Sequence, residues 1–181
     1  MKPLKQLTTI HTLDVIDLDS FKDYNYQAKL TEELDALDQD FDQAIINKIV
    51  LWKVNRYAHL TEDALELLNQ IRPSGAVAEK RTKAVLKNLL DITGIRLPMA
   101  STILRFRNPH HFQILDQRVY RFLYGKPYHN TTVVDDQING YLSYLEQLKV
   151  VCHKKNIPFH QADRILYMMD IKYNKEYKIK Y

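Results

Sequence analysis

The chain has 181 residues, of which 45% are hydrophobic and 27% are charged, so it is long enough to bury a core as one domain or two small lobes. Cys152 is its single cysteine, which excludes internal disulfides and a four-cysteine iron–sulfur cluster. No apolar run approaches the ~20 residues that span a bilayer, and residues 1–19 lack the apolar core of a signal peptide. We therefore expect a cytoplasmic protein without a membrane partner.

The net charge of +4 is unevenly distributed along the chain. Residues 13–42 hold ten acids against two lysines, a net charge of −8, whereas residues 80–126 hold ten basic residues against Asp91 and Asp116, a net charge of +8. A basic block of this kind is expected of a nucleic-acid-binding face. The alternative is that these lysines and arginines are ordinary solvated surface residues.

The first half of the chain is predicted to be helical because its apolar residues recur three or four positions apart. The expected helices are 31–37, 40–57, 61–71 and 78–91. Residues expected on their buried faces include Phe41, Ile45, Ile49, Trp52, Leu65, Leu68, Ile71, Val85, Leu86, Leu89 and Leu90. Thr61 is expected to cap the third helix, because its hydroxyl oxygen can accept a first-turn amide proton.

The second half is also predicted to be helical. A helix is predicted over 135–154, with Ile138, Tyr141, Leu142, Leu145 and Leu148 on one face. It is followed by a break at 156–158 and by a last helix from about His160, with Ile165, Leu166, Met169 and Tyr173 inward. Tyr173, Tyr177 and Tyr181 are interpreted as a core-facing stripe rather than a base-stacking platform. The predicted fold class is all-α, in a single domain over residues 1–181, with a core at 76–125 and flanking helices at 31–72 and 135–175.

Residues 91–125 carry the most informative pattern. A helix is expected to end at Asp91, with a tight turn at Gly94 and a second helix opened by Pro98, because glycine takes φ > 0 past a helix end and proline is favoured in the first turn. Amides at such a turn and at the next helix N-terminus suit a phosphate. After Asn108-Pro109, the apolar run 112–115 leads to Asp116 at the start of another helix.

This stretch resembles the signature of the helix-hairpin-helix DNA glycosylase superfamily. The sequence I-T-G-I-R-L-P-M-A, an apolar helix and then L-D-Q-R-V-Y-R place five residues on the family positions, with 22 residues from the glycine to the aspartate: Gly94, Ala100, Asp116, Val119 and Arg121. The resemblance covers about 35 residues. It implies a two-lobed helical fold with the hairpin at a cleft, and a double-stranded DNA partner.

The resemblance also implies roles for individual residues. Asp116 would be catalytic, because a carboxylate stabilises the cationic sugar that forms as an N-glycosidic bond breaks. The DNA-binding residues would be Gly94, Ile95, Arg96, Leu97, Pro98, Arg105, Arg107, Arg118 and Arg121. Asp116 could instead be only a helix cap. No metal and no cofactor are expected, because the histidines near 110, 153 and 160 lack zinc-ligand spacing.

Two residues depart from the family pattern. Pro98 stands where bifunctional members have a lysine nucleophile, so a lyase step through that lysine is not expected. Arg96 replaces the second hairpin glycine. Three functions stay open: a monofunctional DNA glycosylase, a non-catalytic DNA- or RNA-binding protein with this fold, and a helical protein-interaction module that uses the acidic segment 13–42.

Overall fold

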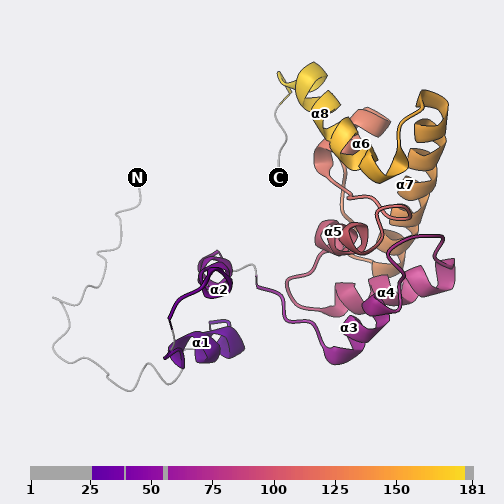
Figure 1. The fold of residues 1–181 in the computed structure, drawn as a ribbon. Helices are drawn as coiled ribbons and strands as arrows, with labels where there is room; N and C mark the ends of the chain where they lie inside the picture. Colours follow the sequence, from indigo (N-terminus) through magenta and orange to yellow (C-terminus); the bar gives the residue numbers. More distant parts are fainter. Residues whose placement is uncertain (1–25, 39, 55–56, 178–181) are drawn as a thin grey trace, which may run out of the picture. The chain divides into compact units, whose positions relative to one another are not determined.

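The computed structural model describes residues 26–38, 40–54 and 57–177 (Figure 1). These residues form eight α-helices and one short 3-10 helix, with no strand among them, so the predicted all-α class is confirmed for this part of the chain. None of the helices described is both long and apolar enough to cross a membrane. The chain divides into two compact units, residues 1–57 and 58–181. The predicted single domain over residues 1–181 would include both units, and it stays a prediction.

The described residues of the first unit form two helices, α1 (Ala28–Asp35) and α2 (Gln43–Lys53). Asp42 caps α2 by accepting a hydrogen bond from the amide of Ile45 (2.8 Å). The two helices are joined through Trp52, whose indole N–H donates to the hydroxyl of Thr31 (2.9 Å). The ring of Tyr26 lies edge-on to Trp52, and its hydroxyl donates to the Trp52 carbonyl (3.0 Å).

Three predictions for this unit were wrong in detail. α1 begins at Ala28 rather than at Thr31, which lies in the interior of the helix. Phe41 is 62% exposed instead of lying on the buried face with Ile45. It precedes the cap of α2, so the helical periodicity that buries Ile45 does not extend back to it. The helix predicted to run to Tyr57 ends at Lys53, and Tyr57 is not helical; residues 55–56 lie outside the described residues.

In the second unit, α4 (Glu79–Asp91), α5 (Leu97–Arg107) and α7 (Val134–Lys155) surround the main core. α3 (Glu62–Asn69) packs on α4 and α5, and Thr61 caps it as predicted by accepting the amide of Ala64 (3.2 Å). The core residues contributed by α4, α5 and α7 include Val85, Leu86, Leu89, Leu97, Ala100, Leu104, Ile138, Tyr141, Leu145 and Leu148. The predicted helical periodicity is therefore confirmed for the centre of the chain.

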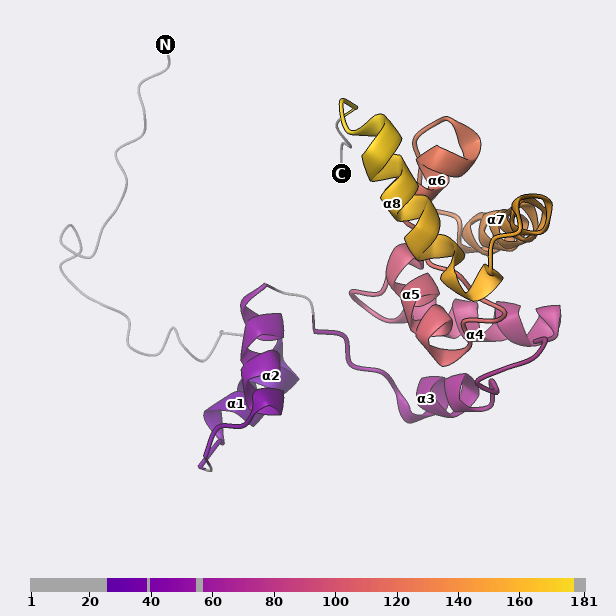
Figure 2. The ribbon, with the colours of Figure 1, turned by 45° about the horizontal axis from the view of Figure 1, so that its top comes forward.

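α6 (Gln117–Tyr124) and α8 (Ala162–Asn174) lie side by side at one end of this unit (Figure 1, Figure 2). A short 3-10 helix, Phe159–Gln161, leads into α8, so the last helix begins two residues later than predicted. The residues that α8 buries are Ala162, Asp163, Leu166 and Asp170.

The prediction for the C-terminal tyrosines was wrong for the residues described. Tyr173 is 61% exposed and Tyr177 is 69% exposed. The buried face of α8 repeats at Ala162, Leu166 and Asp170, so Met169 and Tyr173 lie outside it and are exposed. Tyr181 is outside the described residues. The same kind of error affects Leu65 of α3, which is exposed although it was expected to point inward.

Candidate nucleic-acid interface

The predicted hairpin joins α4 to α5. Gly94 has φ +90°, in the left-handed region that glycine occupies without strain. The amide of Ile95 donates to the carbonyl of Ile92 (3.0 Å) and closes the turn. Ile95 and Leu97 are buried and anchor the hairpin on the core, whereas Gly94 and Arg96 are exposed between them. The hairpin is thus held from below and presents its outer side to solvent.

The N-terminus of α5 has no side-chain cap. Its N-cap residue is Arg96, which cannot accept an amide proton through its side chain, and Pro98 lies within the first turn. Helix dipoles leave partial positive charge on the first-turn amides. Pro98 is exposed at this helix end, and proline has no side-chain amine that could act as a nucleophile.

Arg96 lines a cavity of about 280 Å³ between the hairpin and the start of α7. Its lining combines apolar side chains with hydroxyl and amide groups: Leu90, Ile95, Asn130, Thr131, Thr132, Val134 and Gln137. Gln137 donates to the carbonyl of Thr131 (2.8 Å), which fixes the loop that forms one wall. Arg96 is the one charged residue of this lining.

The segment before Asp116 is held in place by side chains from two helices. The hydroxyl of Ser101 accepts the amide of Leu115 (3.0 Å). Tyr141 and Tyr144 of α7 donate to the carbonyls of Gln113 (2.9 Å) and Ile114 (2.7 Å). This extended segment therefore satisfies its buried backbone groups without a sheet partner. It places Asp116 in a fixed position at the start of α6.

Asp116 is half-buried and caps α6. Its Oδ1 accepts the amide of Arg118 (2.7 Å), while its Oδ2 makes no hydrogen bond to any described residue. Burial raises the pKa of the nearby Tyr144 well above its usual value, and the charge of Asp116 adds to this rise. The cap interpretation of Asp116 is thus correct, and it leaves one carboxylate oxygen available.

Arg118 and Arg121 both bind Asp170 of α8. Arg121 donates through Nε to Oδ1 (2.9 Å) and through Nη2 to Oδ2 (2.6 Å), and Arg118 Nη1 donates to Oδ2 (3.2 Å). Asn174 adds a third partner through its amide (2.9 Å). Asp170 is fully buried. These two arginines, predicted to contact DNA, therefore join α6 to α8 and compensate a buried carboxylate.

Arg105 and Arg107 also have partners within the protein. Arg105 is buried, with its Nε 3.1 Å from Oδ2 of the buried Asp163 and its Nη2 donating to the carbonyl of His160 (3.2 Å). Arg107 donates to the carbonyls of Leu68 (3.3 Å) and Asn69 (2.7 Å) at the end of α3. A buried guanidinium such as that of Arg105 is not placed where a duplex phosphate could reach it.

The basic block contains four residues without an ion pair or hydrogen bond to any described residue: Lys80, Lys87, Arg96 and Lys126. Lys83 makes an exposed ion pair with Glu79 (2.7 Å), and such pairs contribute little. Of the nine predicted DNA-binding residues, Arg96 therefore carries the cationic side chain that is still available to a ligand. The positive charge counted along the sequence is partly compensated by Asp163 and Asp170, which are distant in sequence.

His111 is the half-buried histidine of this unit. His111 accepts the amide of Val77 through Nδ1 (3.3 Å), and burial lowers the pKa of His111 together with the charge of Lys149. Among the residues that the structure describes, no three histidine, cysteine or acidic side chains are grouped to hold a metal.

Comparison with family profiles, with curated protein sequences and with solved structures gave no significant match.

Several residues that organise the site had no role in the sequence-based prediction. Ser101 and Tyr144 form hydrogen bonds to the segment before Asp116, and Gln113 links that segment to α8 by accepting the amide of Asp163 through Oε1. Asp163 and Asp170 bind the arginines. The spacing of the two aspartates could have identified them. Asp163, Leu166 and Asp170 lie three and four positions apart, which places all three on one buried face of a helix. A buried carboxylate requires a cation, and the arginine-rich stretch is the obvious source.

Proposed function

We propose that the 58–181 unit is a DNA-binding protein that contacts the phosphate backbone of duplex DNA through its hairpin, Gly94 to Pro98. One observation carries this proposal: Arg96 presents an exposed guanidinium, without an ion pair or hydrogen bond to any described residue, beside the uncapped N-terminus of α5. The hairpin amides and the helix dipole add favourable potential for an anion at the same place. Contacts of this type position a protein on DNA without reading sequence.

The geometry favours this function over a helical protein-interaction module. A guanidinium offers a planar set of donors that matches two phosphate oxygens at once. Ile95 and Leu97 hold the backbone of the hairpin rigid from below, so little conformational entropy remains to be lost on binding. Arg118 and Arg121 contribute indirectly, because they keep α6 and α8 together.

Arg96→Ala is expected to weaken the binding of a fluorescently labelled duplex roughly 10- to 100-fold, as the loss of a hydrogen bond to a charged group implies. The measurement is an anisotropy titration at constant salt. The matched control is Arg164→Ala, which removes the same charge from an exposed residue of α8 whose side chain makes no ion pair with a described residue. Equal losses in the two variants would reject the hairpin as the contact, and RNA duplexes titrated in parallel distinguish the two nucleic acids.

A second candidate function is the hydrolysis of an N-glycosidic bond by Asp116, as the resemblance to DNA glycosylases implies. The observation in its favour is that Asp116 is fixed by a rigid segment and keeps Oδ2 available. A preorganised carboxylate is the group that this chemistry needs. The cavity beside Arg96 is not lined by Asp116, so DNA binding is the first proposal and base excision the second.

A further inference from the structure

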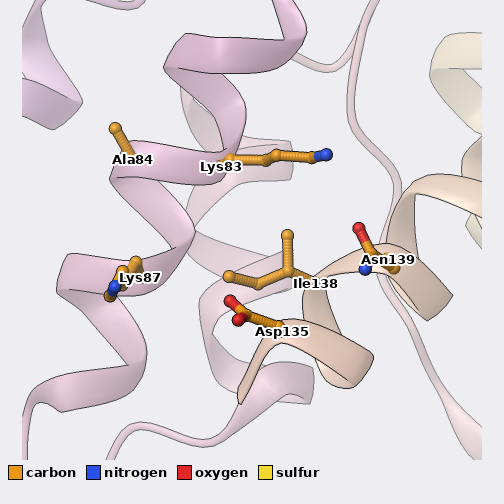
Figure 3. Close-up of a pocket in the computed structure, with 6 residues that line it drawn as sticks. All are labelled: Lys83, Ala84, Lys87, Asp135, Ile138 and Asn139. Carbon is orange, nitrogen blue, oxygen red and sulfur yellow. The ribbon is translucent and has the colours of Figure 1, made fainter.

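A second cavity, of about 300 Å³, lies between α4 and α7 (Figure 3). α4 contributes Lys83, Ala84 and Lys87, and α7 contributes Asp135, Ile138 and Asn139. In Figure 3, Ile138 lies between the two helices, and the lysines project from α4. The cavity therefore has an apolar floor and a rim of charged and amide groups.

This cavity is next to the one beside Arg96, because their lining residues are neighbours on both helices. Lys87 of one cavity and Leu90 of the other are three positions apart on α4, and Val134 and Ile138 are four positions apart on α7. Residues at these spacings share a helix face. The two cavities therefore lie in succession along the α4–α7 contact, beginning at the hairpin, and are together called the path.

The groups that line the path are chemically complementary to an unpaired nucleotide chain. Lys83, Lys87 and Arg96 suit successive phosphates, and the apolar floor of each cavity suits a sugar or a base face. The carboxylate of Asp135 can accept hydrogen bonds from base edges, and the amide of Asn139 can both accept and donate them. The exposed ion pair between Lys83 and Glu79 is weak enough to be exchanged for a phosphate.

The size of the two cavities excludes duplex DNA from them. Their volumes of about 300 and 280 Å³ are at the lower end of the ~300–1,000 Å³ of small-molecule pockets, so each can take a nucleotide but not a double helix. The path can therefore take only an unpaired strand. We infer that this path binds a single-stranded extension of the duplex that the hairpin holds. The preferred ligand is then a junction between paired and unpaired DNA, an inference that rests on the proposed function.

The test compares a blunt duplex with the same duplex carrying a single-stranded extension at a 5′ end or at a 3′ end. The wild type is expected to bind one extended duplex roughly tenfold or more tightly than the blunt one, the gain that one charge-assisted contact supplies. Lys87→Ala and Asn139→Trp, which fills the cavity, are expected to remove this advantage and to leave blunt-duplex binding unchanged. Both residues are exposed, and circular dichroism melts verify that the variants fold.

Lys80→Ala is the matched control, because Lys80 is exposed on the same helix and does not line the cavity. It is expected to keep the preference for the extended duplex. Equal affinities of the wild type for blunt and extended duplexes would overturn this inference and leave the proposed function intact. So would an equal loss of the preference in Lys80→Ala and Lys87→Ala. Failure of the wild type to bind either duplex would instead reject the proposed function itself.

Discussion

Asp170→Ala is expected to lower the free energy of unfolding of the 58–181 unit by about 3–5 kcal/mol, the usual cost of breaking a buried ion pair by removing one partner. Asp170 is fully buried and binds Arg118, Arg121 and Asn174. Its removal leaves two guanidinium groups facing each other without the carboxylate between them. The measurement is urea unfolding followed by circular dichroism. A loss below about 1 kcal/mol, the range of exposed ion pairs, would contradict the role of Asp170 in joining α6 to α8.

The same carboxylate predicts how stability depends on pH. Burial by itself would raise the pKa of Asp170, but hydrogen bonds from Arg121, Asn174 and Arg118 and the charge of Arg121 lower it below its usual value. A lowered folded-state pKa contributes stability that is present above the unfolded-state pKa of about 3.9 and is lost as the pH falls through the folded-state value. Asp170→Asn, which keeps the size of the side chain, is expected to lack this contribution.

Asp116→Asn is expected to lower the rate of base release by roughly 10²–10³-fold, if the protein has glycosylase activity, because asparagine lacks the charge that stabilises a cationic sugar. Asparagine still caps a helix, so α6 and the affinity for DNA are expected to be unchanged. The measurement is product formation on duplexes with alkylated, oxidised or deaminated bases, before and after alkali. Because Pro98 stands where the resemblance to bifunctional glycosylases would place a lysine, strands are expected to break only after alkali.

Three outcomes would change this account of Asp116. Strand cleavage without alkali would contradict the monofunctional assignment. Activity that survives in Asp116→Asn would show that another group is catalytic. No release of any base by the wild type would leave DNA binding as the function, with Asp116 as a helix cap that accepts the amide of Arg118.

The local features of the hairpin could be predicted from sequence. Gly94 takes the positive φ that the turn required, Pro98 lies in the first turn of α5, and Asp116 begins α6. Each of these depends on the conformational preference of one residue type at a helix end. Helical periodicity likewise predicted the residues of α4 and α7 that form the core.

The partners of the arginine side chains could not be predicted in the same way, because they are residues distant in sequence. Arg105 lies 3.1 Å from Asp163, and Arg121 lies 2.6 Å from Asp170, 49 positions away. A charge count along the chain treats all ten basic residues of the block alike. The structure divides them into side chains that satisfy buried or helix-end groups and side chains, such as those of Lys87 and Arg96, that stay available.

The most direct test of the central claim is the salt dependence of duplex binding by the wild type and by Arg96→Ala. Phosphate contacts release counterions, so the logarithm of the affinity falls with the logarithm of the salt concentration with a slope of about −0.9 per contact. The contact of Arg96 with one phosphate contributes about −0.9 to this slope, a roughly 3.5-fold loss of affinity between about 50 and 200 mM salt, and Arg96→Ala is expected to remove this contribution. A wild-type affinity that does not change with salt, or a slope that is the same in Arg96→Ala, would contradict a phosphate-binding hairpin.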